Sequence, residues 1–347
     1  MTPIPFSTPK FIRGHPRDPR KTMTHSSFII PRKRGTYVNL QKKLILRHAL
    51  AFLFLLMMVA AAEYSGKKEI IFPEMVALVT GFWIAEKPPW RAGPVKTVAL
   101  MTVCALAGVL LARADFLLWG KVAVGYVAVA AILILWRTNL YPLISACILP
   151  IMIDTEDFFY VGVVFTLSVI LMGGRALFKY AGLLQEEATP WDDAPETDRK
   201  DALVWLITIV VFLVYTAYPL SFGNPYFVAP PLIVAYTAMM KPDCPLLAVP
   251  VKAGGLMALC ALTGFLARSV LVEMAHLPLA VAAGVALALY FAYMALLGLR
   301  NPPAGAALFL PLLLPAAGLE AYPVLMTVST VLLTLICFIC RGVINDE

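Results

Sequence analysis

Residues 94–112 read PVKTVALMTVCALAGVLLA, and Lys96 is the only charged side chain in this stretch. An α-helix needs about 20 predominantly apolar residues to cross the hydrocarbon core of a bilayer. The stretch has nearly that length and is almost wholly apolar, so it predicts a helix that spans a membrane. A chain built from such stretches would be a helical membrane protein.

The same pattern returns in the second half of the chain. Residues 250–264 read PVKAGGLMALCALTG, so Pro-Val-Lys and Cys-Ala-Leu-x-Gly recur at a spacing of 156 residues (250 − 94). Further matches follow in the same order along the chain, and together they predict an internal duplication. They are Lys87-Pro88 with Lys241-Pro242, Arg137 with Arg300, Asn139 with Asn301, Pro142 with Pro303, and Leu149-Pro150 with Leu310-Pro311.

Apolar runs fill most of the sequence. Hydrophobic residues make up 61% of the chain, charged residues make up 14%, and the mean hydropathy is +0.82. A soluble domain is about half apolar and about a quarter charged, so this composition excludes an ordinary soluble fold. We expect an all-α polytopic transmembrane bundle of about twelve segments in two repeats of six. The runs are 44–63, 69–86, 94–112, 117–136, 139–153, 158–178, 201–220, 226–240, 249–267, 274–298, 302–317 and 321–341.

The predicted organisation has four parts, which differ in composition. The N-terminal tail is basic and almost free of acids, so it cannot build a core and disorder is expected there. Met23 is an alternative start residue to Met1. The parts are the tail (1–43), transmembrane repeat 1 (44–178), a cytoplasmic acidic linker (179–200) and transmembrane repeat 2 (201–343).

Charges between the apolar runs predict the orientation. If every run crosses, one side of the membrane collects most of the Lys and Arg residues, and acids predominate on the other side. The positive-inside rule places the basic side in the cytoplasm. We therefore predict cytoplasmic termini, in a bacterial inner membrane or plasma membrane. The same rule explains the net charge of +7, so nucleic acid is not an expected partner.

Two of the runs, 139–153 and 302–317, are short for a span and contain prolines. Proline interrupts helical hydrogen bonding, and matching interrupted segments in two repeats are typical of transport sites. A helix N-terminus with open N–H groups also suits an anion. The alternative is a proline kink with close helix packing. The candidate binding residues here are Asn139, Pro142, Asn301, Pro302, Pro303 and Gly305.

Five further residues, in three places, are candidates for binding. Glu74 is the acid expected closest to membrane depth, where an ionisable side chain is costly and often functional; the alternative is a position at the interface. Lys96 and Lys252 hold equivalent positions near helix starts, where they would attract an anion or anchor the helix at lipid headgroups. Pro230 and Pro231 form a second break in repeat 2.

Two motifs of the second half carry a resemblance to a known family. They are Pro245-Leu246-Leu247-Ala248-Val249-Pro250 and Arg300-Asn301-Pro302-Pro303-Ala304-Gly305-Ala306. This region, 205–318, resembles the HPP family of integral membrane proteins, with Asn301 in place of the signature His. Some plant plastid members are linked to nitrite transport, so the resemblance implies an anion. A weaker likeness is to fusaric-acid-resistance-like aromatic acid exporters, which usually carry a large soluble region.

We expect a secondary transporter or channel for a small solute, with an anion such as nitrite or a small organic acid favoured. The expected partners are the lipid bilayer and the transported ion or small molecule, and a homo-oligomer stays open. No nucleotide-binding, metalloprotease or serine-hydrolase motif is present, so no enzyme activity, cofactor or metal is predicted. The alternatives are a non-transporting membrane scaffold or assembly subunit and a membrane-embedded enzyme that acts on lipid.

Overall fold

The computed structural model describes residues 34–184, 199–241, 244–315 and 318–345. The chain divides into two compact units between Gln41 and Lys42, and the described part of the first unit is the start of one long helix. All packing discussed below lies within the second unit. Most of the predicted tail and of the predicted acidic linker falls outside the described residues.

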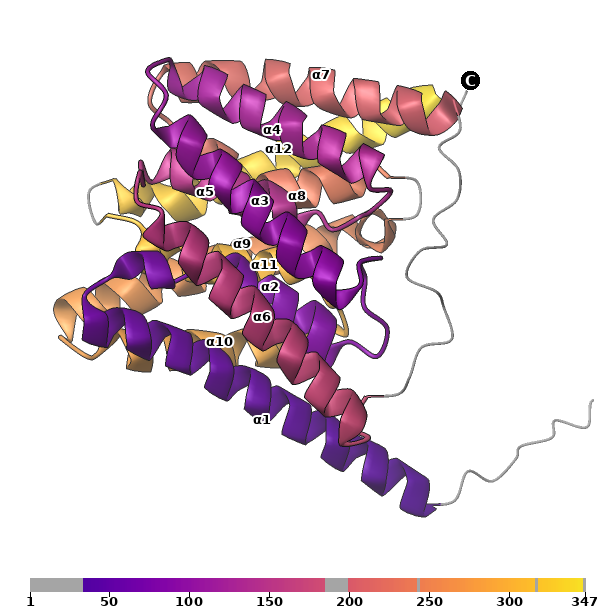
Figure 1. Ribbon diagram of the computed structural model, residues 1–347, viewed down its shortest axis with the longest axis vertical. Coiled ribbons are helices and arrows are strands. Elements are labelled where there is room, and N and C mark those ends of the chain that lie inside the picture. The colour runs from indigo at the N-terminus through magenta and orange to yellow at the C-terminus, as the bar shows by residue number, and fades with distance from the viewer. Residues whose placement is uncertain (1–33, 185–198, 242–243, 316–317, 346–347) are drawn as a thin grey trace, which may run out of the picture. The chain divides into compact units, whose positions relative to one another are not determined.

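The described residues form helices and no strand, as predicted (Figure 1). The long helices are α1 (Arg34–Ser65), α3 (Pro94–Ala112), α4 (Leu118–Leu135), α6 (Phe159–Tyr180), α7 (Arg199–Ser221), α9 (Pro250–Leu266) with its π-helical continuation η5 (Ala267–Met274), α10 (Leu279–Leu297) and α12 (Tyr322–Asn345). The short helices are α2 (Glu74–Val79) with its π-helical continuation η2 (Thr80–Ile84), α5 (Pro142–Met152), α8 (Pro230–Met239) and α11 (Pro302–Leu313). Single turns of 3-10 helix are η1 (Lys68–Ile70), η3 (Pro225–Val228), η4 (Pro245–Ala248) and η6 (Leu319–Ala321).

Eight of the described helices are long and apolar enough to cross a membrane. Helices of this kind indicate an integral membrane protein. The prediction of about twelve segments in two repeats is not confirmed. The other four apolar runs form α2, α5, α8 and α11, which have only 6 to 12 residues. Proline explains why α5, α8 and α11 are short. It stands at the first turn of each of these helices and cannot continue a preceding helix.

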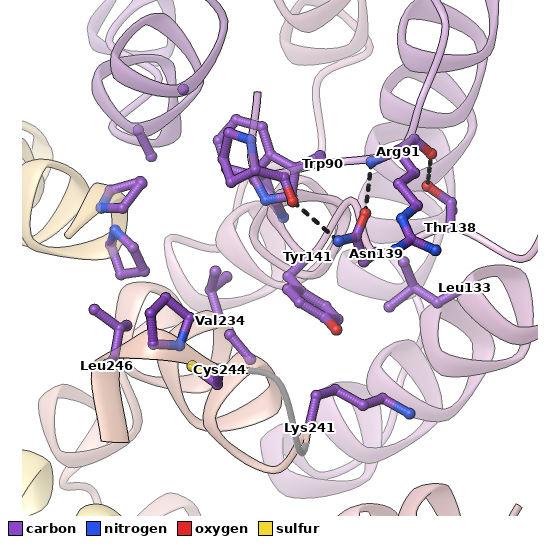
Figure 2. Close-up of a pocket in the computed structure, with 18 of the residues that line it drawn as sticks. Trp90, Arg91, Leu133, Thr138, Asn139, Tyr141, Val234, Lys241, Cys244 and Leu246 are labelled. Carbon is purple, nitrogen blue, oxygen red and sulfur yellow. Dashed lines mark hydrogen bonds between the residues drawn. The ribbon is translucent and has the colours of Figure 1, made fainter. Parts of the chain in front are cut away.

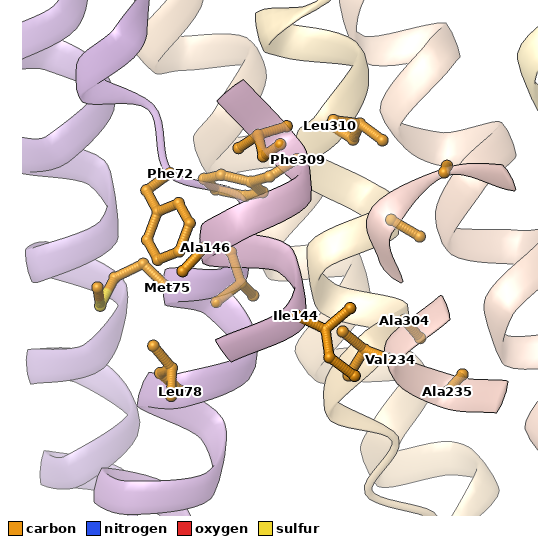
Figure 3. Packing of buried hydrophobic residues seen from close by; sticks show 14 of the residues in the cluster. Phe72, Met75, Leu78, Ile144, Ala146, Val234, Ala235, Ala304, Phe309 and Leu310 are labelled. Atoms are coloured by element: carbon orange, nitrogen blue, oxygen red, sulfur yellow. The ribbon is translucent and has the colours of Figure 1, made fainter. Parts of the chain in front are cut away.

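The short helices lie inside the protein. Residues 142–151 of α5 and 303–313 of α11 are all buried. The long helices, in contrast, expose large apolar side chains such as Leu110 and Val285, which suits contact with lipid. Figure 3 shows buried side chains of the short helices packed together. A helix that protein surrounds on all sides is apolar all round and need not match the thickness of a bilayer.

Glycines let two of the short helices approach their long neighbours closely. A methyl group at Gly108 of α3 would overlap the carbonyl oxygen of Cys147 in α5. A methyl group at Gly264 of α9 would overlap the carbonyl oxygen of Leu308 in α11. Both glycines end the recurring Cys-Ala-Leu-x-Gly motif, so the motif serves backbone contact between helices, as small residues commonly do in membranes.

The short helices of the two predicted repeats pack across one another. Helix α2 contacts α11, and α8 contacts α5. The hydroxyl of Tyr126 in α4 is 2.9 Å from that of Thr237 in α8. Tyr290 of α10 instead donates to the carbonyl of Asn301 at 3.4 Å. A long helix of the first predicted repeat, α4, therefore holds a short helix of the second, α8.

Candidate functional site

A cavity of about 520 Å³ lies where α5 and α11 begin (Figure 2). Pro142 lines it at the start of α5, and Pro302 and Pro303 line it at the start of α11. Thr80 of η2 and Val234 of α8 add to the wall. All four short segments therefore bound the same space, and the two proline-containing runs of the sequence meet in it.

The wall of the cavity is strongly basic. Five cationic side chains line it, whereas Asp201 is the one carboxylate among its described lining residues. A pocket lined by one sign of charge, with low-dielectric walls, concentrates ions of the opposite sign. The cavity is therefore suited to an anion. The cations are Lys87, Arg91, Arg137, Lys241 and Arg300.

The backbone at the two helix starts offers fewer donors than predicted. The N–H of Leu143 in α5 already donates to the carbonyl of Leu140 at 3.1 Å. In α11, Pro302 and Pro303 have no N–H group, and the N–H of Ala304 donates to Asn301 at 3.1 Å. An anion in the cavity would thus be held by the cationic side chains and the helix dipoles rather than by a row of open N–H groups.

Asn139 organises one part of the wall. Its side-chain oxygen accepts a hydrogen bond from the N–H of Arg91 at 2.6 Å, and its amide donates to the carbonyl of Pro89 at 3.0 Å. Thr138 donates to the carbonyl of Arg91 at 2.8 Å (Figure 2). The Asn139 side chain therefore fixes the loop that carries Arg91, and this use leaves less of the amide for a ligand.

Among the five cations of the cavity, Lys241 is the one most enclosed by protein. Its Nζ lies 3.9 Å from Oδ1 of Asp201 and 4.2 Å from the centre of the Trp205 ring. Burial lowers the pKa of Lys241 to about 8, and the nearby Asp201 carboxylate partly opposes this shift. The charge of Lys241 is therefore sensitive to pH close to neutrality.

The remaining candidates in α11 lie behind the wall. Asn301 is 2% exposed and donates to the carbonyl of Ala253 at 3.1 Å, whereas its side-chain oxygen has no hydrogen-bond partner among the described residues. Gly305 faces Val76 and Tyr290, and a methyl group there would overlap Val76. Both positions serve the contact of α11 with its neighbours, and neither lines the cavity.

The candidates near helix starts also lie away from the cavity. Lys96 donates from its Nζ to the carbonyl of Trp136 at 2.6 Å, and Lys252 is exposed. Pro230 and Pro231 are buried at the start of α8. None of these four residues lines the cavity.

The Glu74 side chain is buried. The residue is 1% exposed, and its Oε1 accepts a hydrogen bond from Ser145 of α5 at 2.5 Å. It thus lies inside the protein, where the short helices α2 and α5 meet.

From the sequence alone, the five cations of the cavity contributed only to the prediction of the orientation in the membrane. A signal for a site was nevertheless present, because Lys87 matches Lys241 and Arg137 matches Arg300 in the predicted internal duplication, beside the interrupted runs. Trp90 and Trp205 also line the cavity and carried no such signal.

The fold and this site define a helical integral membrane protein with a basic interior cavity. Comparisons of the chain with protein-family models, with curated proteins and with solved structures give no match.

Proposed function

We propose that this protein is a secondary transporter for small anions, and that the basic cavity is its binding site on the cytoplasmic side. The observation that carries the proposal is the meeting of two proline-started, fully enclosed short helices at a wall with five cations and one carboxylate. Transporters with internal repeats commonly bind their solute where interrupted helices of the repeats meet.

The size and the composition of the cavity fit a small organic or inorganic anion. Its volume of about 520 Å³ lies within the range of small-molecule sites, which is about 300–1,000 Å³. Trp90, Tyr141 and Trp205 supply flat apolar surface beside the cations. This combination accommodates nitrite or nitrate with water, and also a small carboxylate.

The packing of the short helices supports a change of access. Val234 lines the cavity and belongs to the buried apolar cluster with Ile144 and Ala304 (Figure 3). Because α2 contacts α11 and α5 contacts α8, movement of one repeat against the other would separate these side chains. Alternating access by such motion needs no new fold, only a different packing of the same elements.

The resemblance to the HPP family points the same way, since it covers α11 and the loop before α9. Asn301 takes the place of the signature His and is buried against Ala253, away from the cavity. The proposal therefore rests on Arg137, Arg300 and their neighbours, and on no imidazole.

A flux panel tests the proposal. Purified full-length protein in proteoliposomes is offered nitrite, nitrate, formate and pyruvate, and exchange across the membrane is measured against protein-free liposomes. We expect exchange of at least one anion. Arg300→Gln should slow this exchange, and the control Lys252→Gln, at an exposed position, should leave it unchanged. Absence of exchange for all four anions would remove the proposal and favour a scaffold, for which deletion of residues 1–43 is the matching test.

A further inference from the structure

Helix packing alone does not explain why a carboxylic acid, Glu74, is buried at this position. Its Oε1 accepts the hydrogen bond from Ser145, whereas its Oε2 is buried and has no hydrogen-bond partner among the described residues. A buried carboxylate is strongly destabilised unless a cation or several donors compensate its charge. One serine hydroxyl is the only compensation that the structure provides.

Among the described residues, no cation acts on Glu74. The elements packed against α2 are η2, α5, α6 and α11. The hydroxyls of Tyr160 in α6 and Tyr322 in α12 are within electrostatic range of Glu74, and the thiol of Cys147 in α5 is within that range of Tyr160. Arg175 shares α6 with Tyr160 but donates to the carbonyl of Phe82, at the opposite end of the α2–η2 segment.

The carboxyl group lies just behind the cavity. Ala77 of α2 and Pro142 of α5 line the cavity wall. Glu74 and Ser145 are each three residues further from the cavity on the same two helices, which is about 4.5 Å at the helical rise of 1.5 Å per residue. About one helical turn therefore separates this hydrogen-bonded pair from the cavity.

The second repeat supplies an internal comparison. Pro73 at the start of α2 corresponds to Pro230 at the start of α8, a spacing of 157 residues (230 − 73), so Pro231 occupies the position of Glu74. Pro303 matches Pro142 at a spacing of 161 residues (303 − 142), so Ala306 occupies the position of Ser145. Helices α8 and α11 also pack against each other, and both residues are buried. The helix contact thus needs neither an acid nor a hydroxyl.

We propose that Glu74, held by Ser145, is a proton-binding site that couples anion transport to a proton gradient. This inference rests on the proposed function. With the cavity closed at its inner end, the carboxyl group keeps its proton and is neutral. When the helices separate and water reaches it, the proton passes to water, and the resulting carboxylate is stabilised by hydration and by Ser145.

The charge on Glu74 also sets the direction of coupling. A carboxylate about one helical turn from the cavity repels an anion in it, whereas the protonated form does not. An anion therefore binds more tightly to the protonated protein, and by linkage the anion favours protonation to the same degree. Proton and anion then move together in the same direction.

Transport assays separate coupling from transport itself. Wild type, Glu74→Gln and the buried control Ser168→Ala are reconstituted, and the panel anion that wild type exchanges fastest is used. Exchange is measured at equal pH on both sides, and accumulation is measured under a pH gradient that is acidic outside. We expect Glu74→Gln to exchange the anion but to lose gradient-driven accumulation, and Ser168→Ala to retain both.

The protonation of Glu74 has a readout of its own. An infrared difference spectrum of wild type against Glu74→Gln, at neutral pH in detergent, should show the C=O band of a protonated carboxyl group. An ionised carboxylate in that spectrum overturns the inference, even if the variant fails to transport.

The outcomes of the two proposals differ. Wild-type exchange without gradient-driven accumulation, or full accumulation by Glu74→Gln, overturns coupling through Glu74 and leaves anion transport standing. If wild type exchanges none of the panel anions, the proposed function fails, and the coupling role fails with it.

Discussion

Lys241 lies 3.9 Å from Asp201, the one carboxylate among the described residues of the cavity wall. The pair joins the end of α8 to the start of α7, and the ring of Trp205 covers the ammonium group. This salt bridge therefore contains a cavity cation whose charge changes near neutral pH.

The first prediction is a loss of anion binding as the pH rises through about 8. The pKa of Lys241 is lowered to about 8, so the side chain is a cation below that pH and neutral above it. Loss of one cation that contacts the ligand should weaken binding about tenfold. Fluorescence of Trp90 and Trp205 reports anion binding between pH 6.5 and 9.5. In Lys241→Arg, measured together with Glu74→Gln so that no proton on Glu74 contributes, the charge persists, so binding that still falls near pH 8 would contradict this assignment.

The second prediction concerns the two matched arginines. Arg137→Gln and Arg300→Gln should each weaken anion binding by roughly 1 kcal/mol, about fivefold, because each removes one charge from the wall. Titration of each variant with nitrate measures the change. Lys96→Gln is the control, since Lys96 contacts Trp136 outside the cavity. Equal weakening of anion binding in all three variants would mean that the general surface charge, and not the cavity, determines anion binding.

The third prediction tests the close helix contacts. Gly264→Ala should destabilise the protein by about 1–3 kcal/mol, because the added methyl overlaps the backbone of α11. Gly255→Ala is a matched control in the same helix, where nothing lies within 4 Å and alanine favours the helix. Thermal unfolding in detergent should place the melting point of Gly264→Ala clearly below that of wild type and the melting point of Gly255→Ala at or above it.

The fourth prediction concerns the start of α10. The two carboxylate oxygens of Glu63 accept the N–H groups of Leu279 and Ala280 at 2.8 and 3.0 Å. An acid at a helix N-terminus satisfies open donors and interacts favourably with the helix dipole, so Glu63→Ala should cost about 1 kcal/mol. Unfolding midpoints are compared with Glu320→Ala, an exposed acid of η6. A melting point of Glu63→Ala equal to that of this control would contradict the capping role.

The sequence predicted the helical class well, because apolar runs of membrane length leave few alternatives. It overestimated the number of full spans, because hydropathy is the same for a helix against lipid and for a helix inside the protein. Residues 139–153 and 302–317 were predicted as short segments, and only packing shows that protein encloses residues 142–151 and 303–313.

The site was predicted in part. Asn139, Pro142, Pro302 and Pro303 line the cavity, and matching interrupted segments were the signal that found them. The cations were not predicted as site residues, because a positive loop residue looks the same in the sequence whether it marks the orientation in the membrane or lines a binding site. Their convergence depends on how α2, α5, α8 and α11 cross, and contacts between segments so far apart leave no local pattern.

The packing of α2 against α11 has a consequence for how the protein is made. Translation delivers the N-terminal part first, so α2 leaves the ribosome long before residues 302–313 exist. Until then one side of α2 and the Glu74 carboxyl lack their final cover. A nascent chain that stops before α11 should therefore be a preferred substrate for membrane quality control, and assembly is complete only when nearly the last segment arrives.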